Sequence, residues 1–237
     1  MTGPIPPLQS GTSAATRAMR ASVIVTPGTP LLFDTVRASG PDGIRFDVWY
    51  CNRHVPALTR AAGVGRLRRY AAPALASYLV LAELATESGM LASLPVPDPA
   101  PTTVVHTERF VGQPLGTQRR EDCPEEILES AIAYPVYFNV PDSREAEFNR
   151  WYTEEHLPML LACREWVMCR RFRVTQSPML NWTHVALHYL TDLRALQSPE
   201  RDAARSTPWR RQLEAEEWFK PEYRIFYGIK YTSPEPT

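Results

Sequence analysis

Residues 148–160 read Phe-Asn-Arg-Trp-Tyr-Thr-Glu-Glu-His-Leu-Pro-Met-Leu, and this stretch decides the fold. Residues 46–58 read Phe-Asp-Val-Trp-Tyr-Cys-Asn-Arg-His-Val-Pro-Ala-Leu, so the same pattern stands 102 positions earlier. An Arg-Arg-aromatic triplet at 68–70 and 170–172 repeats with the same offset. Repetition at one fixed spacing is typical of a duplicated unit. We therefore predict two similar modules in one chain.

The length and the net charge limit the classes of protein to which this chain can belong. The chain has 237 residues, enough for two modules of about 100 residues, each with its own core. Copies within one chain are expected to pack as a homodimer would. The formal net charge is zero and no long run of one sign occurs, which does not favour nucleic-acid binding. No stretch of about 18 apolar residues indicates a membrane span.

The ends and the cysteines favour a cytoplasmic protein. Residues 1–20 are rich in Pro, Gly, Ser, Thr and Ala and lack an apolar core of signal-peptide length, so we predict a disordered tail. A second short tail is expected at 233–237. The four cysteines show no CxxC pair and no zinc spacing. Buried free thiols in a reducing compartment are the expected state.

The helix of the second copy carries the repeated motif. Asp142 or Ser143 is suited to cap its start, after a strand and a turn. The helix presents Phe148 and Trp151 on one face, because residues three and four positions apart are neighbours on a helix. Leu157 precedes a proline and is expected to leave the α region, so we predict that the helix kinks or ends there.

The other expected elements complete a β-α-β-β-α-β order, which is that of a ferredoxin-like unit. In the second copy, strands are expected at 135–140, 167–174, 183–190 and 223–231, with helical segments at 192–196 and 201–218. In the first copy, strands are expected at 31–36, 67–71, 78–84 and 103–111, with helices at 45–58 and 87–94 and an extra edge strand at 22–26.

We predict an α+β fold of two tandem ferredoxin-like (βαββαβ) modules at 21–112 and 133–232, joined by a linker at 113–132. Two helices cover one face of each sheet. The opposite face needs cover as well, because a large exposed apolar patch is rare. The sheet of the other copy can supply it, which gives a closed, barrel-like pseudo-dimer within one chain. Whether two chains also form a homodimer stays open.

The F-x-x-W-Y-x-x-x-H-x-P-x-L helix, followed by the Arg-Arg-aromatic strand, resembles the EthD-like branch of the dimeric α/β-barrel superfamily. The resemblance is strongest over 136–172, and the first copy matches chiefly over 46–70. It implies that this chain is a homodimer fused into one polypeptide. The superfamily includes muconolactone-type isomerases, aromatic polyketide cyclases and dehydratases, cofactor-free monooxygenases and haem-binding relatives. The resemblance therefore indicates the fold more firmly than the reaction.

Histidines are the first candidates for chemistry. His54 and His156 each lie two residues before a proline, where an imidazole could face a pocket and exchange protons near neutral pH. Either could instead brace the helix through a backbone carbonyl. The third strand of the second copy carries Trp182, His184 and His188 at alternate positions, so these side chains should share one face. The two histidines could join His156 in a pocket or lie silent between the two sheets. Three histidines could also ligate a metal, but we predict none.

Aromatic and basic residues supply further candidates. The spacing of the Trp-Tyr pairs is typical of core packing, although the hydroxyls of Tyr50 and Tyr152 could reach a substrate carbonyl. In each Arg-Arg pair one side chain should point inward, where it could bridge the modules or, as Arg171, hold a substrate anion. Residues 207–211, with Trp209, could form a lid or a solvated connection.

We predict a cofactor-independent cyclase, dehydratase or isomerase for a small aromatic, polyketide-like or lactone substrate. His156 would be the acid–base group, assisted by His184 or His188 and oriented by Tyr152. Predicted substrate contacts are Trp151, Trp182, Arg171, Trp209, His54 and Tyr50. One alternative is a monooxygenase, either cofactor-free or haem-binding. Another is a non-catalytic protein that binds a metabolite. No phosphate-binding, dinucleotide-binding or serine-hydrolase motif is present.

Overall fold

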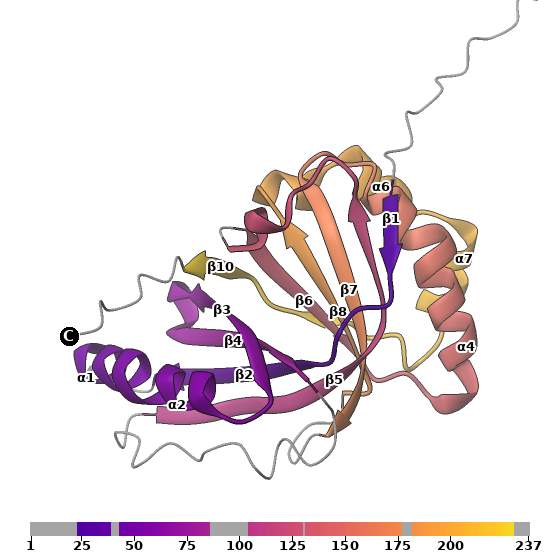
Figure 1. The fold of residues 1–237 in the computed structure, drawn as a ribbon. Helices are drawn as coiled ribbons and strands as arrows, with labels where there is room; N and C mark the ends of the chain where they lie inside the picture. Colours follow the sequence, from indigo (N-terminus) through magenta and orange to yellow (C-terminus); the bar gives the residue numbers. More distant parts are fainter. Residues whose placement is uncertain (1–22, 39–42, 86–103, 130, 177–181, 230–237) are drawn as a thin grey trace, which may run out of the picture.

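The computed structural model describes residues 23–38, 43–85, 104–129, 131–176 and 182–229 (Figure 1). The tails predicted at 1–20 and 233–237 and the helix predicted at 87–94 lie outside these ranges. Within them, every helix is too short or too polar to cross a membrane.

The first module has the predicted ferredoxin-like order of strands. Its elements are β2 (Leu31–Ala38), α1 (Gly43–Trp49), η1 (Tyr50–His54), α2 (Val55–Arg60), β3 (Val64–Ala72), η2 (Pro73–Leu75), β4 (Ser77–Leu84) and β5 (Val104–Arg120). The strands lie in the order β5-β2-β4-β3, and every pairing among them is antiparallel.

The second module repeats this arrangement. Its elements are β6 (Ile132–Phe138), α4 (Asp142–Trp151), η4 (Tyr152–His156), α5 (Leu157–Leu160), β7 (Trp166–Gln176), β8 (His184–Leu190), η5 (Leu193–Gln197), α6 (Pro199–Arg205), α7 (Pro208–Glu214), β9 (Glu222–Tyr223) and β10 (Phe226–Ile229). The short helix η3 (Glu125–Glu129) precedes them. The strands lie in the order β10-β6-β8-β7, and β9 also pairs with β6. The strand predicted at 223–231 is therefore broken into two pieces, and its last two residues lie outside the described ranges.

The two sheets close into one barrel by exchanging edges. The last strand of the first module, β5, pairs with β7 of the second, and the last strand of the second, β10, pairs with β3 of the first. Each module thus supplies the same two edges to the other, as expected for a dimer fused into one chain. The barrel encloses an aromatic and aliphatic core that includes Phe33, Tyr70, Phe110, Phe172 and Leu187. The predicted fold class is confirmed.

Strand β5 is longer than the sequence suggests. We expected it to end at Val111 and a linker to begin at residue 113, but the strand continues to Arg120. Its second half pairs with β7 on one side and with β1 (Val23–Thr26) on the other, so its backbone groups find partners on both sides. The extra edge strand predicted near 22–26 is confirmed as β1.

The repeated motif contains the same unusual helical turn in both modules. The backbone N–H of Leu157 donates to the carbonyl of Tyr152, five residues back, and that of Val55 donates to Tyr50 in the same way. Leu157 keeps α-region angles, with φ −64° and ψ −45°, so the prediction that it leaves the α region is wrong. A wider π turn lets the helix continue past the following proline, which would crowd a regular turn.

Candidate functional site

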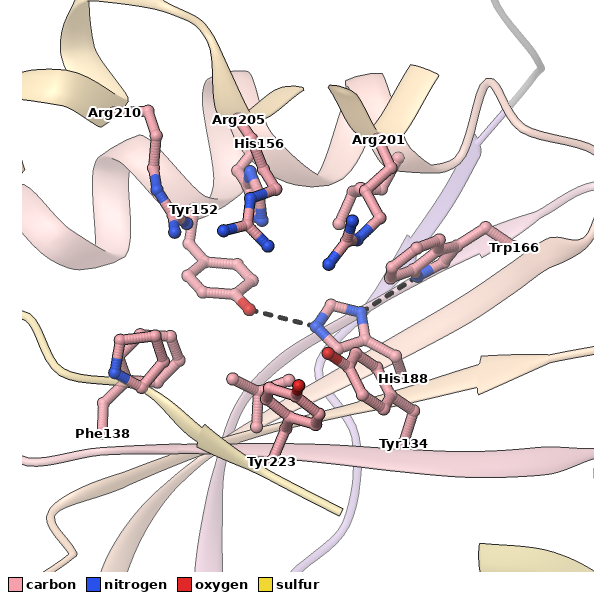
Figure 2. Close-up of a pocket in the computed structure, with 13 residues that line it drawn as sticks. Tyr134, Phe138, Tyr152, His156, Trp166, His188, Arg201, Arg205, Arg210 and Tyr223 are labelled. Atoms are coloured by element: carbon pink, nitrogen blue, oxygen red, sulfur yellow. Dashed lines mark hydrogen bonds between the residues drawn. The ribbon is translucent and has the colours of Figure 1, made fainter. Parts of the chain in front are cut away.

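A cavity of about 210 Å³ lies in the second module, between the sheet and the helices η4, α5, α6 and α7 (Figure 2). Its lining combines aromatic, imidazole and guanidinium groups with a few aliphatic side chains. The lining residues are Tyr134, Val136, Phe138, Tyr152, His156, Leu160, Trp166, His188, Arg201, Arg205, Arg210, Pro221 and Tyr223. In the part of the chain that the structure describes, neither Asp nor Glu lines this cavity.

A chain of two hydrogen bonds crosses the cavity wall. The indole Nε1–H of Trp166 donates to Nδ1 of His188 at 3.0 Å, and Nε2 of His188 lies 3.0 Å from the hydroxyl of Tyr152 (Figure 2). Because an indole can only donate, Nδ1 is an acceptor and the proton of neutral His188 is on Nε2. Nε2–H then donates to the oxygen of Tyr152, whose own hydrogen is left to donate into the cavity.

Burial keeps His188 and Tyr152 uncharged. It lowers the pKa of His188 to about 3, so the imidazole stays neutral near neutral pH. It also raises the pKa of Tyr152 well above its ordinary value of 10.0, so the hydroxyl keeps its hydrogen. With both ring nitrogens of His188 in hydrogen bonds, this histidine orients Tyr152, and Tyr152 presents a fixed donor.

His156 presents a second neutral imidazole to the cavity. Its ring stacks on Trp151 with centroids 4.5 Å apart, and Nδ1 has no hydrogen-bond partner among the described residues. Burial, followed by the positive charge of Arg210, lowers the pKa of His156 well below 6.5. The free base is therefore the resting form, and a bound anion would raise its affinity for a proton.

Three arginines make the cavity electropositive. Arg201 and Arg205 lie one turn apart on α6, and neither forms an ion pair with a described residue. Arg210 on α7 is buried over the ring of Phe219 and donates to Glu214 at 2.8 Å. Guanidinium groups around a concave, partly desolvated site favour a bound oxyanion.

Helix caps place these arginines. Ser198 accepts a hydrogen bond from the N–H of Arg201 and begins α6, while Thr207 accepts one from the N–H of Arg210 and begins α7. Thr207 also donates to the carboxylate of Glu155 at 2.6 Å, which ties α7 to η4. The helix Pro208–Glu214 agrees with the helical segment expected at 201–218, and the alternative of a solvated connection at 207–211 is wrong.

The equivalent region of the first module contains a buried charge cluster. Nε2 of His54 lies 2.7 Å from Oδ2 of Asp34, and Arg109 donates to both carboxylate oxygens at 3.1 and 2.9 Å. Burial alone would raise the pKa of Asp34, but the hydrogen bonds from His54 and Arg109 outweigh it and lower the pKa to about 2. His54 and the fully buried Tyr50 therefore belong to a packed interior.

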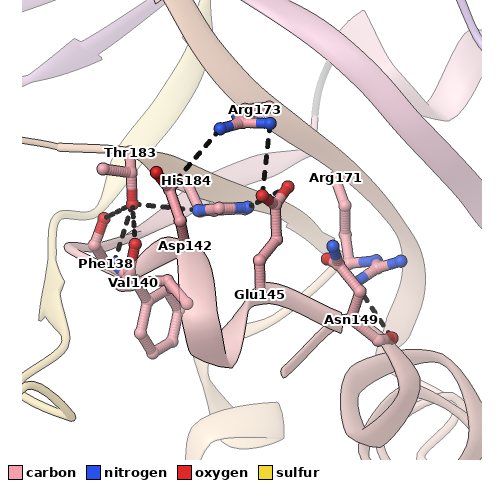
Figure 3. Close-up of polar contacts among 9 residues, drawn as sticks. All are labelled: Phe138, Val140, Asp142, Glu145, Asn149, Arg171, Arg173, Thr183 and His184. Carbon is pink, nitrogen blue, oxygen red and sulfur yellow. Dashed lines mark hydrogen bonds and ion pairs between the residues drawn. The ribbon is translucent and has the colours of Figure 1, made fainter. Parts of the chain in front are cut away.

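His184 lies apart from this cavity. It contacts Glu145 at 3.3 Å and the hydroxyl of Thr183 at 2.9 Å, on the helix side of the sheet (Figure 3). The structure does not bring it together with His156 and His188. The alternative that His184 and His188 lie between the two sheets is wrong, because both face the helices. Within the described ranges, no cluster of His, Cys, Asp and Glu suits a metal ion.

The two neighbouring arginines of β7 have different positions. Arg171 donates to the side chain of Asn149 in α4 at 3.1 Å (Figure 3). It also donates to Thr153 in η4 at 2.8 Å, so it holds both helical segments against the sheet. Arg170 points the other way and donates to Thr29 at 3.2 Å, as expected for a bridge between the modules. Arg171 does not line the cavity of Figure 2.

The predicted tryptophan contacts lie outside the cavity lining. Trp151 stands behind His156 and donates to Glu155 at 3.2 Å. Trp182 packs against Tyr137, with centroids 5.7 Å apart, in the barrel interior. Trp209 packs under Arg150 at 5.1 Å. Trp182 precedes β8, so the alternation of strand side chains does not extend to it.

Several lining residues were not predicted: Tyr134, Trp166, Arg201, Arg205 and Tyr223. One signal was available in the sequence. Arg201 and Arg205 are spaced by four on a helical segment, so they share a face. The aromatic residues carried no such signal, because an aromatic in a strand is typical of ordinary core packing.

No protein-family model matches the chain, and no curated protein matches it. Among solved structures, an anthrone oxidase-like protein is similar with a TM-score of 0.58 and 10% identity, covering 90% of this chain and 100% of that one. A mutant chlorite dismutase from Candidatus Nitrospira defluvii is similar with a TM-score of 0.55 and 11% identity, covering 85% and 92%. At such low identity the likeness shows the fold alone, that of dimeric α/β barrels.

Proposed function

We propose that the chain is a cofactor-independent monooxygenase that acts on a compact, enolisable aromatic compound in the cavity of the second module. One observation carries the proposal. Neutral His156, the fixed hydroxyl of Tyr152 and three guanidinium groups surround an aromatic cavity whose described lining contains no carboxylate. Such a site can take a proton from a ligand and hold the resulting anion.

The first step is proton transfer. His156 takes the proton of an acidic enol or phenol hydroxyl, or of the carbon acid beside a carbonyl, as general base. The developing oxyanion accepts hydrogen bonds from Tyr152 and is stabilised by Arg210 in a partly dehydrated site. The imidazolium that forms beside the oxyanion is stabilised by it, which offsets the burial that otherwise lowers the pKa of His156.

The second step uses dioxygen. The electron-rich anion reduces O₂, and the net change is R₂CH₂ + O₂ → R₂C=O + H₂O. The carbon loses four electrons, and the two oxygen atoms gain them to become the carbonyl oxygen and water. A protein of the same fold is named anthrone oxidase-like, and an anthrone has an enolisable CH₂ of this kind. This likeness supports monooxygenation over the predicted cyclisation or isomerisation.

The size of the cavity does not fit haem. The cavity of about 210 Å³ lies below the ~300–1,000 Å³ typical of drug-sized ligands. Both ring nitrogens of His188 are engaged by Trp166 and Tyr152, so this histidine has no lone pair free for iron. No step is therefore assigned to a haem group.

A cyclase, dehydratase or isomerase is the second candidate. The observation that favours it is the pairing of His156 with Tyr152, because a base and a hydroxyl donor on one cavity suffice to move a proton within a substrate. Such a reaction needs the first step and no oxygen. A binding protein without catalysis would need neither step.

The experiment that decides is incubation of purified protein with anthrone and related hydroxyaromatic ketones, with oxygen consumption and product mass recorded together. Monooxygenation predicts oxygen uptake and a product with one oxygen more and two hydrogens fewer, above the rate of autoxidation. Loss of water without oxygen uptake indicates dehydration, and an unchanged mass indicates isomerisation or binding. Either of these results contradicts the proposal.

A further inference from the structure

The two modules allow a direct comparison of corresponding positions. Asp34 on β2 and Val136 on β6 are 102 residues apart, the offset of the repeated motif. Val36 and Phe138, two residues further along each strand, both pack on the helix side of their sheets. Because side chains alternate along a strand, Asp34 and Val136 face the helices too. They are therefore equivalent positions.

The surroundings of these two positions differ in charge. In the first module, the carboxylate of Asp34 meets His54 at 2.7 Å and the guanidinium of Arg109 at 2.9 Å. In the second module, Val136 brings no polar atom, and it lines the cavity together with His156. The histidine is kept and the protein's own carboxylate is missing. Tyr223 pairs with Val136 where Arg109 pairs with Asp34, and Arg210 supplies a guanidinium to the cavity from a different element, α7.

We infer that a planar oxyanion of the ligand lies against His156 and Arg210 in the second module, where Asp34 lies against His54 and Arg109 in the first. The first module then holds an equivalent site, in which the carboxylate of Asp34 occupies the place of the ligand's oxyanion. This inference deepens the proposed function, on which it rests for the choice of cavity. It names the ligand class as a phenolate or enolate, bound in its ionised form.

The charges around the position fit an incoming anion. Arg201 and Arg205 reach the same cavity from α6 (Figure 2), and His188 is neutral. Glu214 pairs with Arg210 but does not line the cavity. An oxyanion at this place would meet an imidazole, a hydroxyl donor and guanidinium groups, so its desolvation is compensated.

The probe is 4-nitrophenol, because its anion is yellow and its neutral form is nearly colourless. Titration of wild-type protein at a pH below the pKa of the free phenol should develop the yellow band as the ligand binds. The NMR signals of His156 should shift on the same binding curve, and those of His54 should not. Binding of the colourless form, or a shift of His54 alone, overturns the inference.

Two variants at one position give the matched comparison. Val136→Asp places a carboxylate on His156 and should weaken phenolate binding more than about tenfold, because like charges in a desolvated site repel. Val136→Asn has nearly the same shape as Val136→Asp without the charge, so it separates charge from size and should bind phenolate about tenfold more tightly than Val136→Asp. Equal binding by both variants overturns the inference, and thermal melting confirms that each is folded. Should Val136→Asp not fold, the wild-type titration still decides.

The test separates this inference from the proposed function. Phenolate binding at His156 without oxygen uptake on any substrate leaves the inference intact and removes the monooxygenase. Oxygen uptake by a variant that has lost phenolate binding removes the inference and leaves the activity.

Discussion

The indole of Trp166 donates to Nδ1 of His188 at 3.0 Å, and this single contact sets the tautomer of a residue that never needs to titrate. Through it, the proton of His188 stands on Nε2 and the hydroxyl of Tyr152 is turned toward the cavity. A donor prepared in advance is the feature expected of a site that stabilises an oxyanion.

Trp166→Phe removes the indole N–H from this arrangement, together with part of the buried ring. Either ring nitrogen of His188 can then carry the proton, so we expect activity or phenolate affinity to fall by about tenfold. Nitrogen NMR of His188 should show a mixture of tautomers. Trp182→Phe in the barrel interior is the matched control and should leave both readouts unchanged. An unmixed tautomer in Trp166→Phe would contradict this account.

Asp34 makes the stability of the first module depend on pH. Its pKa is about 2 in the folded chain against an ordinary 3.8, so its stabilising contribution is present above about pH 4 and is lost as pH falls toward 2. Asp34→Asn should cost about 2 kcal/mol near neutral pH and almost nothing near pH 2. Urea unfolding at both pH values measures the difference. Asp47→Asn, at an exposed aspartate, is the control, and a gap that persists in acid would show that charge is not the cause.

Much of the fold was predictable because the same motif occurs in both modules, so each copy supports the assignment of the other. The motif at 46–58 and 148–160 placed both helices and both histidines, and even the π turns recur at the same offset. The length of β5 was not predictable, since it depends on partners from two distant strands, β1 and β7. Long-range pairing of this kind leaves no local pattern.

The site was less predictable than the fold. His156, Tyr152 and His188 were expected to gather and do line one cavity, but His184 does not join them. Alternation along the strand predicts that His184 and His188 lie on the same face of the sheet. It does not predict which part of the helical layer each of them contacts. The difference between the modules depends on Asp34, a buried charge in an otherwise apolar strand, and its meaning appears only when His54 and Arg109 are seen around it.

A substitution of Arg171 distinguishes a structural role from its predicted role as a substrate contact. Arg171→Met removes buried hydrogen bonds to Asn149 and Thr153 and should lower the free energy of unfolding by about 2 kcal/mol. The affinity for 4-nitrophenol should stay the same, because Arg171 does not line the cavity. Arg173→Met, at a half-exposed neighbour with two ion pairs, should cost less than about 1 kcal/mol. A loss of affinity without a loss of stability in Arg171→Met would restore the predicted contact.

Closure of the barrel depends on two glycines, one at each junction between the modules. Gly112 lies where β5 pairs with β7, and Gly228 lies where β10 pairs with β3. A Cβ on Gly112 would lie 2.8 Å from that of Phe172, and one on Gly228 would lie 2.5 Å from the carbonyl oxygen of Glu129. Alanine at either position should cost about 1–3 kcal/mol through overpacking. Gly65→Ala, where the nearest atom is 3.4 Å away, is the control and should be nearly neutral. Thermal melts of the three variants check this, and equal behaviour would count against close packing at these junctions.

The central claim is that two modules of one fold are unequal, with the working site in the second. Turnover of His156→Ala beside His54→Ala, each corrected for its folded fraction, tests it most directly. We predict that His156→Ala stays folded and loses activity by more than about a hundredfold, in the range for a general base. His54→Ala should lose stability, because the buried carboxylate of Asp34 loses a hydrogen-bond partner, while its folded fraction turns over at the wild-type rate. Equal losses of turnover in the two variants would contradict the claim.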